Sequence, residues 1–194
     1  TITGGTAADT IIANYGTTAV TLSGGGGADI LGGSVAAATN SSNVTFAFTD
    51  MSNYTGSSLF ASSAGTNVLS FANSVVFADV NFTSSSNVQT LQLNGTAGSV
   101  LTVDSAGATM GFTTISAAGA TTGSTFAIGN FTNAISFVGS SGNDTFVVNN
   151  TIGFTSASSI NGGAGTADTV LVSGGVVTDD STFAKITAGT VEVL

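Results

Sequence analysis

Residues 24–31 decide the fold, because they place four glycines, one aspartate and two apolar residues in the order Gly24-Gly25-Gly26-Gly27-Ala28-Asp29-Ile30-Leu31. Glycine adopts the positive φ angles of tight turns without a Cβ penalty, and Asp also favours turns. The segment therefore predicts a glycine turn that presents a carboxylate, followed by an apolar residue that enters the core.

Three other segments repeat this turn, and the four copies form two pairs. Asp9 and Asp29 are 20 residues apart, Asp144 and Asp168 are 24 apart, and residues 4–14 align with residues 139–149 at an offset of 135. Such self-similarity is typical of stacked supersecondary units. The three further copies are Gly4-Gly5-Thr6-Ala7-Ala8-Asp9, Gly139-Ser140-Ser141-Gly142-Asn143-Asp144 and Gly162-Gly163-Ala164-Gly165-Thr166-Ala167-Asp168.

A second, longer repeat relates residues 67–82 to residues 168–183 at an offset of 101. After a two-residue insertion, Val88-Gln89-Thr90-Leu91 aligns with Val191-Glu192-Val193-Leu194. We therefore expect one repeat array over residues 1–194, with subunits of about 1–100 and 101–194. The absence of an initiating Met suggests a processed product or a segment of a larger polypeptide.

Short runs of alternating residues predict an all-β fold. Val44, Phe46 and Phe48 alternate with smaller residues, and Gly, Asn, Ser and Asp clusters separate such runs every 8–12 residues or so. This spacing suits a β-sandwich, a barrel or a solenoid. The repeats favour a parallel β-solenoid of roughly 20-residue coils (a β-roll or β-helix), with the β-sandwich as the alternative. Further alternating pairs are Leu91 and Leu93, Leu101 and Val103, Phe126 and Ile128, and Ile135 and Phe137.

The turn at residues 24–31 matches the nonapeptide G-G-x-G-x-D-x-U-x, where U is a large apolar residue. With this motif the chain resembles the repeats-in-toxin (RTX) calcium-binding β-roll family. The longer repeat resembles the spacer units of bacterial surface-layer and large secreted adhesin-like proteins. The resemblance implies type I secretion and folding in extracellular calcium.

The paired turns predict two Ca²⁺ sites. Two stacked turns would present carboxylate and carbonyl oxygens to a hard cation. Carboxylates about 5 Å apart repel by about 3 kcal/mol at an effective dielectric constant near 20, and no Lys or Arg lies nearby in sequence. The candidate ligand residues are Gly4, Gly5, Asp9, Gly24, Gly25, Gly27, Asp29, Gly139, Gly142, Asp144, Gly162, Gly163 and Asp168.

The composition excludes several classes of function. One basic residue, Lys185, against ten acidic residues excludes nucleic-acid binding. The chain has no His and no Cys, so imidazole or thiolate catalysis, disulfides and zinc sites of the usual kind are excluded. No apolar run approaches the length of a membrane-spanning helix, so we expect no membrane insertion.

These observations predict a structural, non-enzymatic protein of the cell surface or extracellular space, stiffened by calcium and assembling with copies of itself into a surface layer, matrix fibre or filament. Open solenoid ends and uncharged faces favour this association. An adhesin or glycan-binding module, with cell-surface polysaccharide as its partner, is the alternative. A polysaccharide-active β-helix enzyme with paired carboxylates is disfavoured, because the chain has no Trp and only two Tyr to grip a sugar.

Overall fold

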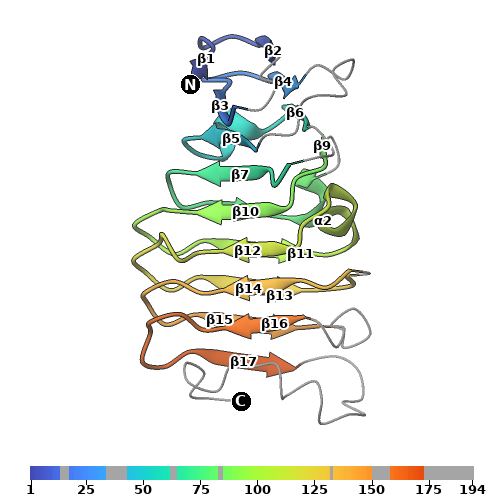
Figure 1. The fold of residues 1–194 in the computed structure, drawn as a ribbon. Helices are drawn as coiled ribbons and strands as arrows, with labels where there is room; N and C mark the ends of the chain where they lie inside the picture. Colours follow the sequence, from blue (N-terminus) through green and yellow to red (C-terminus); the bar gives the residue numbers. More distant parts are fainter. Residues whose placement is uncertain are drawn as a thin grey trace.

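The computed structural model describes residues 1–13, 18–33, 43–61, 65–82, 85–131, 133–149 and 158–172. These residues form a parallel β-solenoid, in which the chain winds through stacked coils from the N-terminal end downward (Figure 1). Every strand pair is parallel, so the solenoid prediction is confirmed and the β-sandwich alternative is wrong.

One face of the solenoid is an eight-stranded sheet, which we call the long sheet. It is continuous from the first coil to the last described one, and each coil contributes one strand to it. Its strands, in spatial order, are β1 (Ile2–Thr3), β3 (Val20–Ser23), β5 (Val44–Phe48), β7 (Val68–Phe71), β10 (Thr90–Leu93), β12 (Thr114–Ser116), β14 (Ser136–Val138) and β16 (Ser159–Asn161).

The second strand of each coil belongs to one of two shorter sheets. The N-terminal sheet contains β2 (Thr10–Ala13), β4 (Ile30–Gly33), β6 (Ser58–Phe60) and β9 (Ser85–Ser86). The C-terminal sheet contains β8 (Val76–Phe77), β11 (Val100–Val103), β13 (Thr125–Ile128), β15 (Thr145–Val148) and β17 (Thr169–Val172). The chain changes from one sheet to the other within a single coil, where the 3₁₀ helix η1 (Asp79–Phe82) separates β8 from β9.

Coil length varies more than the sequence predicts. The first step of the long sheet is 20 residues, from Ile2 to Leu22, as expected. The step from Val20 to Val44 is 24 residues, and the step from Ile30 to Ser58 in the N-terminal sheet is 28. The longest step contains helix α1 (Met51–Tyr54), so a local insertion accounts for the added length.

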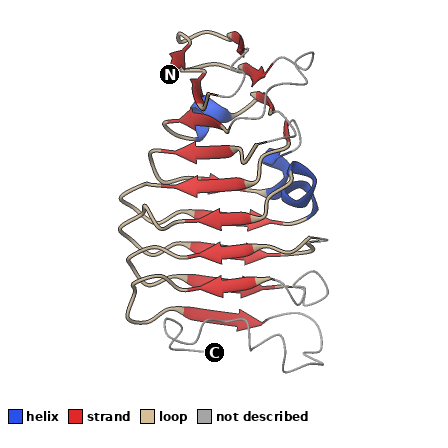
Figure 2. Ribbon diagram, viewed as in Figure 1, coloured by secondary structure: helices blue, strands red, loops and turns tan. Residues whose placement is uncertain are grey.

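Two short helices interrupt the strands (Figure 2). Asp50 caps α1 by accepting hydrogen bonds from the backbone N–H groups of Ser52 and Asn53. Helix α2 (Ser105–Met110) begins after Asp104 and ends at Gly111, whose φ of 102° gives a left-handed C-cap. Asp79 of η1 accepts hydrogen bonds from the first turn of α2, so η1 and α2 are joined at the place where the second face changes sheet.

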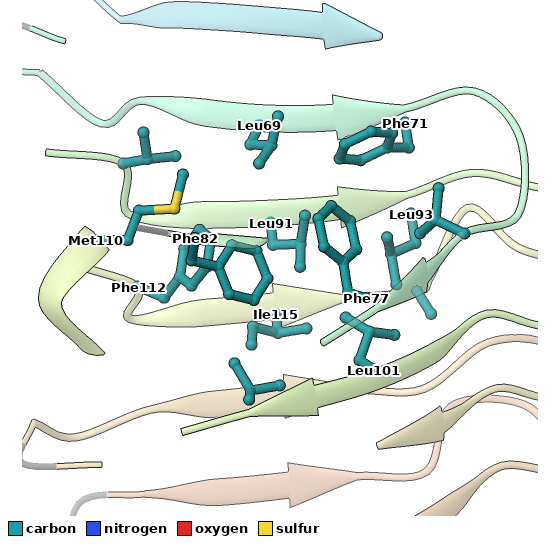
Figure 3. Packing of buried hydrophobic residues seen from close by; sticks show 14 of the residues in the cluster. Leu69, Phe71, Phe77, Phe82, Leu91, Leu93, Leu101, Met110, Phe112 and Ile115 are labelled. Atoms are coloured by element: carbon teal, nitrogen blue, oxygen red, sulfur yellow. The ribbon is translucent and has the colours of Figure 1, made fainter. Parts of the chain in front are cut away.

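Every second residue along the strands points into the interior and fills it, as the period-2 pattern predicts. In β5, Val44, Phe46 and Phe48 are buried and the residues between them are half-buried. The other alternating pairs from the sequence are buried as well. Where the second face changes sheet, aromatic rings from several coils stack against one another, and aliphatic residues from β7, β10, β11 and β12 surround them (Figure 3).

The two sequence repeats occupy different structural positions. The repeat at an offset of 135 places β2 and β15 at the same position in their coils, since both follow a glycine turn. The repeat at an offset of 101 relates β7 of the long sheet to β17 of the C-terminal sheet. The two copies of this repeat therefore form strands of similar sequence on two different faces of the solenoid. Most of the second copy lies outside the described residues.

We predict that Phe77→Ala lowers the free energy of unfolding by about 3–5 kcal/mol. Phe77 is 2% exposed, and its ring packs 5.0 Å from that of Phe71 and 4.8 Å from that of Phe82 (centroid distances). Val76 precedes it in β8 but is 71% exposed, so Val76→Ala should change stability by about 0.5 kcal/mol or less. Urea unfolding measures both, and similar losses in the two variants would contradict the assigned core.

Candidate metal sites

Both predicted aspartate pairs are brought together by the stacking of coils. Each of the four Asp residues is the last residue before a strand of the second face: Asp9 before β2, Asp29 before β4, Asp144 before β15 and Asp168 before β17. Because β2 pairs with β4 and β15 pairs with β17, the members of each pair lie in adjacent coils.

One carboxylate oxygen in each pair binds backbone instead of facing an open gap. Oδ1 of Asp29 accepts a hydrogen bond from the N–H of Asp9 at 2.9 Å. Oδ1 of Asp168 accepts one from the N–H of Asp144 at 2.7 Å. Asp29, Asp144 and Asp168 are buried, whereas Asp9, in the first coil, is partly exposed. The aspartates therefore serve first as connectors between coils.

The same connection recurs where the sequence shows no aspartate. A serine stands at the equivalent position before β6, β11 and β13, and its hydroxyl accepts the N–H of the counterpart residue one coil earlier. The first residue of each strand then donates its own N–H to the carbonyl of that counterpart. We call this two-point contact the coil clamp.

Six coil clamps join the coils of the N-terminal and C-terminal sheets. In each, a side-chain oxygen and a backbone N–H hold the N–H and the C=O of one residue in the preceding coil. With the two holding residues in parentheses, the six held residues are Asp9 (Asp29 and Ile30), Asp29 (Ser57 and Ser58), Val75 (Ser99 and Val100), Ser99 (Ser124 and Thr125), Ser124 (Asp144 and Thr145) and Asp144 (Asp168 and Thr169).

In Asp9 and Asp144, the second carboxylate oxygen closes the glycine turn. Oδ2 of Asp9 accepts the N–H of Gly5 at 2.6 Å, and Oδ2 of Asp144 accepts both the N–H and the hydroxyl of Ser140, at 2.7 and 2.9 Å. Both contacts span four residues, so the aspartate fixes the turn that precedes it. Serine has one side-chain oxygen and aspartate has two, so only aspartate can bind the preceding coil and its own turn through separate oxygens.

The turn glycines allow successive turns to approach closely. Gly25 and Gly163 occupy equivalent positions with φ of 88° and 98°, and a Cβ on either would overlap the turn of the preceding coil. A Cβ on Gly4 or Gly139 would collide with the carbonyl oxygen of the glycine in the next coil. The space between turns is thus occupied by backbone, with no room for side chains. The other predicted glycines, Gly24, Gly27, Gly142 and Gly162, lie in the same turns.

Burial raises the pKa of the Asp144 carboxyl above its usual value, and the charge of Asp168 adds to the rise. The hydrogen bonds from Ser124 and Ser140 act in the opposite direction.

Oδ2 of Asp29 is buried and accepts no hydrogen bond. A buried carboxylate oxygen without a partner is costly, and a proton or a cation would relieve that cost. The two turns carry carboxylate and backbone carbonyl oxygens, and Ca²⁺ prefers oxygen ligands. The residues at Asp9 and Asp29 therefore fit a hard cation chemically.

The remaining acids of the described chain have separate roles. Asp50 caps α1, and Asp79 and Asp104 bind the first turn of α2. Across the described ranges, no three side chains of Asp, Glu, His or Cys form a group suited to a metal ion. Any cation at the paired turns would thus need backbone oxygens as well as carboxylates. Asp179 and Asp180 lie outside the described residues.

The serines of the coil clamps were missed by sequence reasoning. The available signal was their position, one residue before a predicted strand and 24–28 residues from the residue they hold. Serine is abundant throughout the chain, and that position is recognisable only once the strands are aligned.

Comparison of the chain with protein-family models, with curated proteins and with solved structures found no match in any of the three. In the part of the chain that the structure describes, no helix combines the length and apolar character needed to cross a bilayer.

We predict that Ser99→Ala lowers the free energy of unfolding by about 1–3 kcal/mol, because it leaves the buried N–H of Val75 without an acceptor. Thr102 lies in the next strand, β11, and faces solvent, so Thr102→Ala should change stability by about 0.5 kcal/mol or less. Chemical unfolding of both variants checks this, and equal stabilities would show that the clamp contributes nothing.

We predict that Asp144 makes the protein more stable as the pH falls. A carboxyl whose pKa is raised by folding binds its proton more tightly in the folded state, so its contribution is present at low pH and lost as the pH rises through the folded pKa. Asp144→Ser keeps a clamp hydroxyl and removes the titrating group. From about pH 7 to about pH 4, in EGTA, the urea midpoint of the wild type should rise relative to that of Asp144→Ser. Parallel pH profiles would contradict this assignment.

Proposed function

We propose that this chain is a structural, non-enzymatic solenoid that assembles with copies of itself into an extracellular surface layer, matrix fibre or filament. The observation that carries the proposal is the distribution of charge. None of the described strands contains an acidic or basic residue, and all seven described aspartates (Asp9, Asp29, Asp50, Asp79, Asp104, Asp144 and Asp168) lie in turns, in η1 or at helix caps.

The outer surface of the long sheet is suited to lateral packing. Its outward residues are small or of medium size and stand in register, for example Thr90, Thr114, Ser136 and Ser159 in consecutive strands. Uncharged side chains in straight columns can meet a second sheet without burying an unpaired charge. The chain nevertheless carries a net charge of −9, and placing the described acids at turns and caps keeps that charge off the broad faces.

We further propose that Ca²⁺ binds at the N-terminal pair of turns, with Asp29 as its principal carboxylate ligand. The unpartnered, buried Oδ2 of Asp29 supports this assignment. When bound, the ion would supply positive charge in a region that has no basic residue. Extracellular modules bind Ca²⁺ with Kd values of about 10⁻⁴–10⁻³ M, and millimolar calcium outside cells fills such sites.

The engagement of the paired carboxylates supports a non-enzymatic role. A glycosidase needs two carboxyl groups that face a substrate between them. In the C-terminal pair, both oxygens of Asp144 accept hydrogen bonds from the chain itself. In the N-terminal pair, the carboxylate of Asp29 is buried and bound to backbone.

We predict that calcium stabilises the wild type through Asp29. At about 10 mM Ca²⁺, a site with a Kd of about 10⁻⁴–10⁻³ M adds about 1.4–2.7 kcal/mol to the free energy of unfolding relative to EGTA. Asp29→Ser keeps the clamp oxygen, as the serine before β6 does, but removes the unpartnered oxygen and the charge, so the calcium response should disappear. Urea unfolding with and without calcium measures both.

Asp50→Ser is the matched control, because it removes the same charge from a partly exposed cap at which serine is also favoured. This variant should respond to calcium as the wild type does. Electron microscopy of the same samples tests the assembly itself, and we expect ordered sheets or filaments from the wild type in calcium. Dispersed particles at every calcium concentration would refute the structural role, and an unchanged calcium response in Asp29→Ser would refute the assigned ligand.

A further inference from the structure

The six coil clamps form two separate series. The N-terminal series ends at Ser57, which holds Asp29 one coil earlier. The C-terminal series begins at Val75, which Ser99 holds. No clamp joins Val75 to Ser57, because the N–H of Ser57 donates to the carbonyl of Tyr54 in its own coil and Val75 has no side-chain oxygen. We call the coils joined by the two series the N-terminal stack and the C-terminal stack.

The sheets of the second face are interrupted at the same place. The coil that begins with β7 contains both β8, the terminal strand of the C-terminal sheet, and β9, the terminal strand of the N-terminal sheet. The long sheet, by contrast, continues from β5 through β7 to β10 (Figure 1). The stability of a solenoid is approximately the sum of its repeats and of the contacts between neighbouring repeats. A break in these contacts therefore separates the solenoid into two cooperative units unless other contacts bridge it.

The 3₁₀ helix η1, which separates β8 from β9, is bound to the C-terminal stack by one carboxylate. Asp79 of η1 accepts three backbone hydrogen bonds from the start of α2 in the following coil. Its Oδ1 accepts the N–H groups of Asp104 and Gly107, at 2.7 and 3.0 Å, and its Oδ2 accepts the N–H of Ala106 at 2.9 Å. A single side chain thus fixes η1 to α2.

The same short helix also contacts the N-terminal stack. The carbonyl of Asn81 accepts a hydrogen bond at 3.1 Å from the hydroxyl of Tyr54, the last residue of α1 in the preceding coil. The next residue of η1, Phe82, packs 4.8 Å from Phe77 and 5.2 Å from Phe112 (ring centroid distances; Figure 3). Helix η1 therefore joins the coil before it to the coil after it, at the place where the series of clamps is interrupted.

We propose that η1 is a conformational latch that couples the two stacks. While η1 is bound to α1 and α2, the described coils unfold as one unit. When these contacts are released, the N-terminal stack opens first and the C-terminal stack keeps its structure. The order follows from the clamps of the described residues, since two join the N-terminal stack and four join the C-terminal stack.

The test is pulse-labelling hydrogen exchange of the full chain across a urea series in EGTA, read by mass spectrometry. It gives separate unfolding midpoints for residues 18–33 of the N-terminal stack and residues 114–128 of the C-terminal stack, and we expect one shared midpoint in the wild type. A double variant, Asp79→Asn with Tyr54→Phe, removes an acceptor oxygen and a hydroxyl from the latch but keeps the shape of both side chains. In this variant the midpoint of residues 18–33 should fall below that of residues 114–128 by about 0.5 M urea or more.

Ser99→Ala is the matched control, because it also removes a hydrogen-bond acceptor but lies within the C-terminal series of clamps. It should lower the midpoints of the two segments together. Three results would overturn the latch: two different midpoints in the wild type, one shared midpoint in the double variant, or an equal separation of the midpoints in Ser99→Ala.

The latch also determines how far calcium stabilises the solenoid, a step that rests on the proposed calcium site. The proposed ligand, Asp29, belongs to the N-terminal stack. Calcium should therefore raise both midpoints in the wild type, but only that of residues 18–33 in the double variant. If calcium raises both midpoints in the double variant, the latch is wrong. If calcium raises neither midpoint in the wild type, the calcium site is wrong and the measurements in EGTA decide the latch.

Discussion

Satisfaction of the backbone at the corners of each coil is the constraint on which the rest of this solenoid depends. Strands pair with their neighbours along their length, but the residues before six of the described second-face strands also need partners for an N–H and a C=O. The coil clamp supplies both, with the oxygen of Asp29, Ser57 or Ser124 and the N–H of the residue that follows. Because the clamp fixes the register of adjacent coils, the buried phenylalanines stack in line.

The difference between aspartate and serine in the clamp explains why the acids follow glycine turns. Both residues offer one oxygen to the preceding coil. Only aspartate has a second oxygen, and Asp9 and Asp144 use it to bind the N–H four residues earlier, at the start of the turn. In Asp144 the carboxylate therefore shapes the turn as well as joining the coils. The glycine–aspartate pattern of the sequence thus has a structural cause that does not require a metal.

The sequence was sufficient to predict the architecture, because the alternation of residues within strands and the spacing of the repeated turns are both visible in the order of the residues. The buried face of Val44, Phe46 and Phe48 and the stacking of Asp9 on Asp29 follow from spacing alone. The change of sheet between β8 and β9 does not, because it depends on η1 and on contacts between distant segments. The clamp role of Ser99 could not be predicted from the sequence either. Ser99 binds the backbone N–H of Val75, which lies 24 residues earlier and whose apolar side chain gives no sign of this contact.

The C-terminal pair limits what calcium can do in this fold. Stacked acids without basic neighbours suggest that a cation must hold the coils together. Yet Asp144 is buried beside Asp168 and both of its oxygens accept hydrogen bonds from Ser124 and Ser140, so backbone and hydroxyl donors replace a counter-ion there. In the N-terminal pair, by contrast, Oδ2 of Asp29 is buried and accepts no hydrogen bond. Calcium bound at that position would therefore stiffen the first coils of a solenoid whose packing and clamps already determine its shape.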